Sequence, residues 1–253
     1  MVKYINLSQW RHMASREVIY KEKHFELSYE LLNPTQKEVL LILHGWGSNK
    51  EIMMQAFGKR LPEYKHIYLD LPGFGRSNNE MILTTDDYAK IVKLFLETMG
   101  IEAKIAMGHS FGGKVSTLLN TPYLVLLSSS GILVPKVFAV RAKIALFKLF
   151  KPFGLSRLHQ LFISDDAKGM SQEMYETFKN VVNEEFEQNF LSTQSKTLLF
   201  WGKEDTATPL WSAEKIVTLI TDSKLYPLEG DHFFFLKHSA FIAQTISNTC
   251  KES

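Results

Sequence analysis

The sequence contains a single cysteine, Cys250, among 253 residues. One cysteine cannot form an internal disulfide, and it has no second cysteine with which to build a metal site. Long hydrophobic runs are also absent, because no segment approaches the roughly 18 consecutive apolar residues that span a bilayer. The first residues lack the apolar stretch and the cleavage site of a signal peptide. These absences predict a cytoplasmic protein that is not transmembrane and carries no disulfide.

Neither sign of charge is in excess. The chain has 29 Lys and Arg residues against 27 Asp and Glu residues, a formal net charge of +2. This balance gives no reason to expect a nucleic-acid partner. Hydrophobic residues make up 45% of the sequence, enough to bury a sizeable core. We expect neither a metal nor a cofactor.

Short apolar runs alternate with longer helical patterns. Thr84 and Thr85 are predicted to cap a helix that ends near Gly100, and a last helix is predicted over 238–249. Strands separated by helices are typical of an α/β fold with a doubly wound, mostly parallel sheet. The strands are predicted at residues 38–44, 66–71, 104–109, 123–128, 197–201 and 224–226, with an edge hairpin over 17–32.

One segment breaks this alternation. Between Gly131 and about Thr193 the sequence has helical patterns and no convincing strand. We interpret this segment as a helical lid inserted after a central strand. The predicted domains are a core of residues 1–131 and 193–253 and a lid of residues 132–192.

The pattern Gly108-His109-Ser110-Phe111-Gly112 joins a predicted strand to a predicted helix. A serine on so sharp a turn has a strained backbone and presents its hydroxyl above the sheet. Glycines are needed on both sides of it because a side chain there would collide where strand and helix meet. So short a pattern also occurs by chance in structural turns, but in this context it predicts that Ser110 is a catalytic nucleophile.

A serine is a poor nucleophile at neutral pH and needs a neighbouring base. His232 is the predicted base because it lies in the loop after the last predicted strand. His238 is the alternative, although it begins a predicted helix. His109 lies inside the turn, and strand alternation predicts that its side chain points away from the Ser110 hydroxyl.

The acid that orients the base is predicted to be Asp205, at the end of the preceding strand. The order Ser, Asp, His along the chain is the one expected for this architecture. Another position for the acid, after the strand ending near residue 128, is empty, because no Asp or Glu occurs over residues 114–164. Glu204 and Asp231 are the alternative acids, and both are expected to face solvent.

Hydrolysis through a serine also requires donors aimed at the developing oxyanion. The backbone N–H of Phe111, directly after the nucleophile, is the first predicted donor. The second is the backbone N–H of Trp46, in the run His44-Gly-Trp-Gly that follows the first buried strand. His44 itself is expected to lock this loop by hydrogen bonding rather than to act as a base.

Five motifs occur in a fixed order: His44-Gly-Trp-Gly47, Asp70-Leu-Pro-Gly-Phe-Gly-Arg-Ser77, Gly108-His-Ser-Phe-Gly-Gly113, Trp201-Gly-Lys-Glu-Asp205 and Gly230-Asp-His232. Together they resemble the α/β-hydrolase superfamily, over roughly residues 38–247. Within it, the first two motifs resemble both pimeloyl-carrier-protein methyl ester esterases and the meta-cleavage product hydrolases, which cut carbon–carbon bonds. The resemblance implies an α/β-hydrolase fold and a serine hydrolase.

Three functions follow from this resemblance. The first is hydrolysis of a small-molecule carboxylic ester, of the acyl or methyl ester type, through an acyl-enzyme. The alternative enzyme is a carbon–carbon bond hydrolase acting on a 2-hydroxy-6-oxo-dienoate. The third is a ligand-binding receptor that keeps the fold without the chemistry. A complete triad with both oxyanion donors favours an enzyme over a receptor.

The predicted lid has basic residues in its first half, and acidic residues dominate its second half. Either its two halves pair with each other, or its basic half binds an acidic carrier protein or anionic lipid. Phe138 and Phe147 in the lid, and Phe233 beside the base, are the predicted substrate contacts, although apolar lid residues could equally pack the lid onto the core. The first half has basic residues and no acid: Lys136, Arg141, Lys143, Lys148, Lys151 and Arg157.

Overall fold

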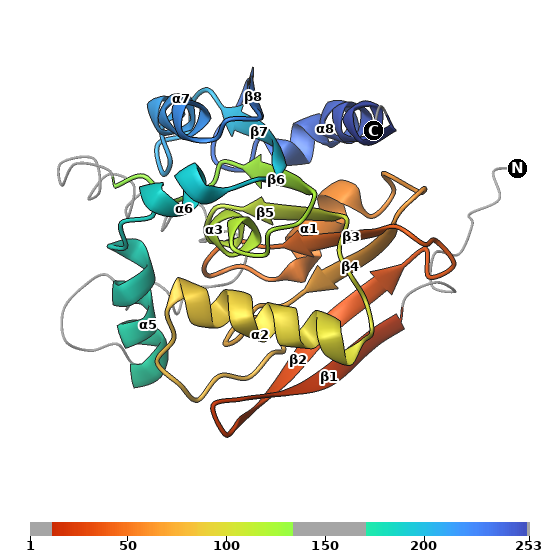
Figure 1. Ribbon diagram of the computed structural model, residues 1–253, viewed down its shortest axis with the longest axis vertical. Helices are drawn as coiled ribbons and strands as arrows, with labels where there is room; N and C mark the ends of the chain where they lie inside the picture. The colour runs from red at the N-terminus through yellow and green to blue at the C-terminus, as the bar shows by residue number, and fades with distance from the viewer. Residues whose placement is uncertain (1–11, 134–170, 252–253) are drawn as a thin grey trace, which may run out of the picture.

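The computed structural model describes residues 12–133 and 171–251, which fold around one eight-stranded sheet (Figure 1). The order across the sheet is β1-β2-β4-β3-β5-β6-β7-β8. Strands β1 and β2 form an antiparallel hairpin at one edge, β2 is antiparallel to β4, and the pairings from β4 to β8 are parallel. The strands are β1 (His12–Tyr20), β2 (Lys23–Leu32), β3 (Val39–Leu43), β4 (Lys65–Leu69), β5 (Ile105–His109), β6 (Tyr123–Leu127), β7 (Lys196–Gly202) and β8 (Ser223–Leu228).

Helices cover both faces of the sheet, which confirms the doubly wound arrangement (Figure 1). Helices α1 and α8 pack together on the face that carries Leu40 and Ile42. Helices α2 and α3 pack on the opposite face, against Leu41 and Leu43, and α6 and α7 cover β6 and β7. No helix in the described part of the chain has the length and hydropathy that crossing a bilayer requires. The helices are α1 (Lys50–Phe57), α2 (Thr85–Thr98), α3 (Phe111–Thr117), α5 (Gln172–Val182), α6 (Glu187–Ser192), α7 (Leu210–Leu219) and α8 (Phe235–Lys251).

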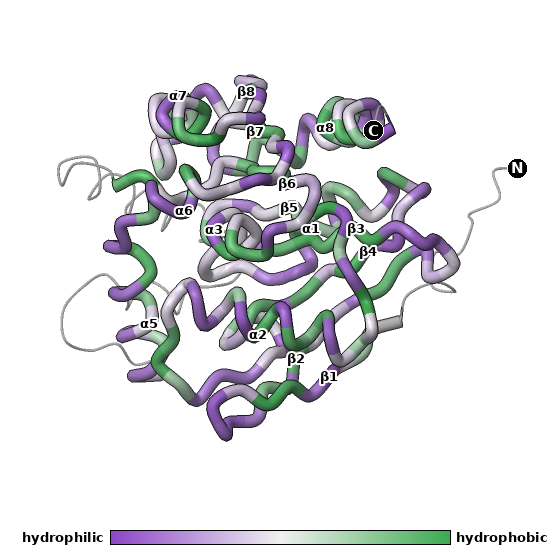
Figure 2. The backbone as a smooth tube through the Cα atoms, viewed as in Figure 1, coloured by the Kyte–Doolittle hydropathy of each residue, from purple (hydrophilic) through white to green (hydrophobic). Residues whose placement is uncertain are grey.

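Local sequence signals explain these elements. Strand β3 is buried at all five positions, as its unbroken apolar run predicts for a central parallel strand. Helix α2 begins after Thr84, whose side chain accepts from the Asp87 N–H while the Asp87 carboxylate accepts from the Thr84 N–H. Along α2, hydrophobic and hydrophilic residues follow each other within every helical turn, as expected for a helix that buries one side (Figure 2).

The parallel strands bring distant parts of the sequence to one edge. Strands β3, β5, β6, β7 and β8 run in the same direction, so the loops that follow their carboxyl ends meet at the same edge of the sheet. These loops carry His44, Ser110, Ser128, Asp205 and His232. This edge is therefore where a functional site is expected.

The loop after β4 is held by a buried ion pair. The Nζ of Lys50 lies 2.5 Å from Asp70 Oδ2, and only 3% and 1% of the two side chains are exposed. The Asp70 carboxylate also accepts from the backbone N–H groups of Lys50 and Arg76. At Gly75, where φ is +57°, a Cβ would overlap the same carboxylate. Asp70 thus shapes the whole turn that follows β4.

Replacing Asp70 with asparagine should lower the free energy of unfolding by about 3–5 kcal/mol, because it leaves the Lys50 ammonium buried without a counterion. Urea unfolding of the purified variant measures this change. Asp86→Asn is the matched control, since Asp86 pairs with Lys90 on an exposed helix face, where ion pairs stabilise little. Equal effects of the two substitutions would contradict a structural role for the buried pair.

Candidate active site

Ser110 lies on a strained turn between β5 and α3. Its backbone has φ 51° and ψ −115°, a region that residues other than glycine seldom adopt. The turn is held by hydrogen bonds on both sides: the Ser110 N–H donates to the Leu127 carbonyl at 3.0 Å, and the Ser110 carbonyl accepts from the N–H groups of Gly113 and Ser130. The backbone strain expected at Ser110 is present.

The two glycines of the pattern are needed for close packing. A Cβ at Gly108 would overlap the backbone of Gly112, where the strand and the helix meet. A Cβ at Gly112 would come within 2.5 Å of the His44 carbonyl oxygen. The collision predicted from the sequence is therefore confirmed at both positions, and larger residues would push Ser110 away from the sheet edge.

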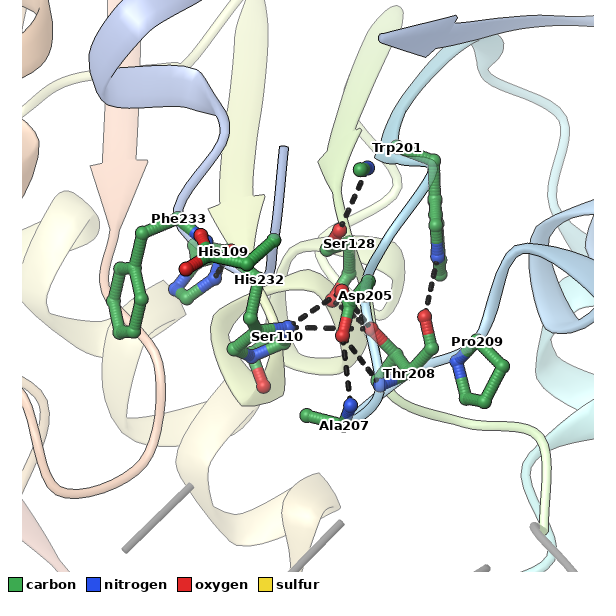
Figure 3. A network of polar contacts seen from close by, with 12 residues as sticks. His109, Ser110, Ser128, Trp201, Asp205, Ala207, Thr208, Pro209, His232 and Phe233 are labelled. Atoms are coloured by element: carbon green, nitrogen blue, oxygen red, sulfur yellow. Dashed lines mark hydrogen bonds and ion pairs between the residues drawn. The ribbon is translucent and has the colours of Figure 1, made fainter. Parts of the chain in front are cut away.

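His232 and Asp205 form a buried pair beside this turn (Figure 3). The His232 Nδ1 lies 2.7 Å from Asp205 Oδ2, and both side chains are almost fully buried. Because the carboxylate can only accept, Nδ1 carries the proton and Nε2 carries the lone pair. The structure brings together the predicted acid and base, from the loops after β7 and β8.

Ser110 and His232 lie at the same edge of the sheet, but they are not hydrogen bonded to each other. The ring of His109, which directly precedes Ser110, lies 4.5 Å from the His232 ring between centroids. The His232 Nε2 is buried and forms no hydrogen bond with any residue of the described ranges. Hydrogen bonds between nucleophile and base are often long in unliganded enzymes and shorten when substrate binds.

The Asp205 carboxylate is surrounded by donors. It accepts from the backbone N–H groups of Ala207 at 2.8 Å and Thr208 at 2.9 Å, and from the Thr208 hydroxyl at 2.8 Å. Burial acts to raise the pKa of Asp205, but His232 and the hydrogen bonds from the Thr208 N–H and the Ser128 side chain outweigh it and lower the pKa. The carboxylate therefore stays ionised over the pH range in which histidines titrate.

Sequence reasoning missed Thr208 and Ser128. Thr208 follows Asp205 by three residues, a spacing at which an Asp side chain commonly accepts backbone N–H groups in a turn, so this partner had a local signal. Ser128 had none, because it reaches Asp205 from the end of β6. It occupies the position at which the sequence lacks a carboxylate.

The alternative residues lie elsewhere. Glu204 is exposed and accepts from the Gly230 N–H, and Asp231 is exposed and accepts from the Phe233 N–H at 2.9 Å. His238 is half-buried, and its Nε2 donates to the Glu229 carbonyl at 2.8 Å. In the structure the carboxylate bonded to His232 is that of Asp205.

The loop after β3 lies against Ser110. A Cβ placed on Gly45 would come within 3.1 Å of the Ser110 Cβ. His44 is buried, its Nδ1–H donates to the Gly45 carbonyl, and its Nε2 accepts from the Leu71 N–H at 3.0 Å. Burial lowers the pKa of His44, so its ring stays neutral. The prediction that His44 locks this loop is confirmed.

The residues of both predicted oxyanion donors are in contact. The ring of Trp46 lies 5.5 Å from the ring of Phe111 and 5.3 Å from the ring of Phe178 in α5, between centroids. The Phe111 N–H is the first of helix α3, so it has no acceptor within the helix. The side chains of the two predicted donor residues therefore belong to one cluster of aromatic rings.

Part of the predicted lid can be compared with the structure. Phe138, Phe147 and the basic residues between 136 and 157 lie outside the described residues. Phe233 is buried, with its ring 5.2 Å from that of His109. Two of the lid acids pair with lysines of the predicted core: Glu184 with the buried Lys114 of α3, and Glu187 with Lys215 of α7.

Within the described residues, no three His, Cys, Asp or Glu side chains gather in a way that could hold a metal ion. The site instead combines a strained serine, a histidine with a buried carboxylate partner and a loop that packs against the serine. This arrangement can move a proton between Ser110 and a substrate when the serine hydroxyl turns toward His232.

Three comparisons with known proteins agree with this fold. A family described as alpha/beta hydrolase fold matches residues 38–120. An uncharacterized hydrolase from Bacillus subtilis, YugF, is 27% identical over 231 residues, which cover 79% of this chain and 85% of that protein. A pimeloyl-[acyl-carrier protein] methyl ester esterase from Vibrio campbellii is 36% identical over 88 residues, about a third of each chain.

The fold is also shared with a solved structure. An esterase from Exiguobacterium antarcticum (EaEST) superimposes with a TM-score of 0.74 at 18% identity, covering 94% of this chain and all of that one. At this identity the likeness concerns the fold. The family match and the eight-stranded sheet show that this chain has the α/β-hydrolase fold.

Proposed function

We propose that this α/β hydrolase is a serine esterase, with Ser110 as nucleophile, His232 as general base and Asp205 as the residue that orients the base. The observation that carries the proposal is the buried Asp205–His232 hydrogen bond at the sheet edge that carries the strained Ser110, with His109, the residue before the serine, in contact with His232. The names of its relatives, a hydrolase and a methyl ester esterase, and of the structural neighbour, an esterase, support it.

In the proposed mechanism the Ser110 oxygen attacks the ester carbonyl while His232 Nε2 takes the hydroxyl proton. The carbonyl electrons move onto oxygen, where the N–H groups of Phe111 and Trp46 stabilise the oxyanion. Collapse of this intermediate breaks the bond to the alcohol, which leaves with the proton from His232. Water, deprotonated by the same histidine, then hydrolyses the acyl-enzyme and regenerates Ser110.

Asp205 acts through His232. Its carboxylate accepts the Nδ1 proton, which keeps the Nε2 lone pair directed away from the carboxylate, and it stabilises the imidazolium that forms during attack. The donors from Ala207 and Thr208 hold the carboxylate in place. Because His232 and the Thr208 N–H also lower the pKa of Asp205, Asp205 does not take the proton itself.

We further propose that residues 132–192 form a lid over the site and that the acyl group is apolar. The rings of Trp46, Phe111 and Phe178 beside the proposed oxyanion hole favour an apolar acyl chain over a charged one. An acidic carrier protein or anionic lipid at the basic half of the lid is a finer proposal. It rests on the charge pattern of the sequence and on the name of one relative, a pimeloyl-[acyl-carrier protein] methyl ester esterase.

The proposal is tested with p-nitrophenyl esters of graded acyl length and, in parallel, a 2-hydroxy-6-oxo-dienoate. We expect kcat/KM for the esters to exceed that for the dienoate and to rise with acyl length, since each buried methylene adds about 0.8 kcal/mol of binding. Turnover of the dienoate alone would instead identify a carbon–carbon bond hydrolase. Binding without turnover of either substrate would identify a receptor.

A further inference from the structure

His109, directly before the nucleophile, contacts the proposed base. It is buried, and its Nε2 lies 3.0 Å from the backbone carbonyl oxygen of His232. A carbonyl oxygen can only accept, so Nε2 carries a proton and donates it. The His109 ring also packs on the rings of His232 and Phe233, at 4.5 and 5.2 Å between centroids (Figure 3). The ring of Phe235 lies 4.8 Å from that of His109. It thus fixes both the backbone and the ring of His232.

The other side of the His109 ring lies against the loop after β3. A Cβ at Gly45 would come within 2.9 Å of His109 Nδ1, closer than side chains pack. Gly45 directly precedes Trp46, the second proposed oxyanion donor. The imidazole of His109 therefore fills the space between the loop that carries this donor and the loop that carries the base.

His109 is neutral in this position. Burial, and next the neighbouring His232, hold its pKa well below the ordinary value of 6.5. Two other titratable groups affect the pKa of His109: Asp205 raises it and His44 lowers it. A neutral ring matters because His232 becomes positively charged during attack, and a second cation in contact with it would oppose that step.

We propose that His109 is a positioning residue, whose Nε2–H donates to the His232 backbone and whose ring sets the distance between the base and the oxyanion loop. This inference rests on the proposed function, because it assigns His109 a role only if His232 is the base. In a packing role only the volume of the His109 ring would matter. In the proposed role the hydrogen-bond donor at Nε2 is also required.

The experiment compares three substitutions of His109. Glutamine carries an amide nitrogen at about the position of Nε2, whereas that of asparagine lies near the position of Nδ1 and cannot reach the His232 carbonyl. Leucine keeps the volume and removes the donor. We expect His109→Leu and His109→Asn to lower kcat for a p-nitrophenyl ester about 10- to 100-fold, the effect of a misplaced catalytic group. His109→Gln should recover most of the wild-type kcat.

KM should change little in all three variants, because an interaction needed only in the transition state affects kcat and kcat/KM equally. His66 supplies the matched control. It is also a buried histidine whose Nε2 donates to a backbone carbonyl, that of Leu61 at 2.9 Å, but it lies at the start of β4, away from the carboxyl-end loops. His66→Leu should lower stability and leave kcat per folded molecule unchanged.

Folding of each variant is checked by circular dichroism before kinetics. The inference is overturned if His109→Asn keeps wild-type kcat, or if His109→Gln is as slow as His109→Asn, because the hydrogen bond would then play no part. The contrast between two soluble polar variants decides this even if His109→Leu does not fold. Failure of the proposed function is distinguished by Ser110→Ala, which would then retain the hydrolysis.

Discussion

Replacing Ser110 with alanine is expected to lower kcat for ester hydrolysis about a million-fold, the usual cost of losing the nucleophile in a serine hydrolase. Without Oγ no acyl-enzyme can form, and the remaining groups can only help water to attack. The fold should persist, since the strained backbone at φ 51° is supported by backbone hydrogen bonds that alanine keeps. Steady-state kinetics on purified protein, with unfolding curves for both forms, measure the two effects.

Ser116 provides the control for this substitution. It is another buried serine of α3, and its hydroxyl has no hydrogen-bond partner within the described ranges. Ser116→Ala should therefore keep kcat near the wild-type value. If Ser110→Ala kept a substantial share of the activity while Ser116→Ala lost it, the assignment of the nucleophile would be wrong.

Replacing Asp205 with asparagine is expected to lower kcat about 10⁴-fold, as the loss of the acid does in other triads. The asparagine amide can donate to His232 Nδ1, which would place the ring proton on Nε2. The base could then no longer accept the serine proton. KM should change much less than kcat, because the acid does not touch the substrate.

Glu204→Gln and Asp231→Asn are the matched controls for the acid. Both carboxylates are exposed and accept from backbone N–H groups, a role that the amide oxygens can keep. Each variant should therefore retain most of the activity. A larger loss in Asp231→Asn than in Asp205→Asn would transfer the role of the acid to Asp231.

The sequence predicts the central sheet closely because its strands are continuous apolar runs. The run at 38–44 becomes β3 at Val39–Leu43, and the run at 104–109 becomes β5 at Ile105–His109. The last helix starts at Phe235 rather than at residue 238, because Phe235 is apolar and buried and shows no polar boundary. Helices α1 and α7 had no prediction, since each spans at most ten residues and lacks a long apolar period.

Motif order was enough to predict that Asp205 contacts His232 and that Ser110 follows a strand ending at the same edge of the sheet. Ser110, Asp205 and His232 each follow a parallel strand, so the topology alone brings them to one edge. The residues that contact Asp205 and His232 from other strands were harder to predict, because these contacts join segments that are far apart in the sequence. Strand alternation predicted that His109 points away from the serine hydroxyl, but it gave no indication that this ring packs on His232.

The most direct test of the account is labelling with a fluorophosphonate, followed by mass spectrometry of the intact chain and of its peptides. A serine activated by the Asp205–His232 pair should take up one phosphonyl group per chain, on Ser110. The adduct should be absent from Ser110→Ala and should form far more slowly in Asp205→Asn. An unlabelled wild-type chain, or an adduct on another serine, would contradict the assignment of Ser110 as the nucleophile.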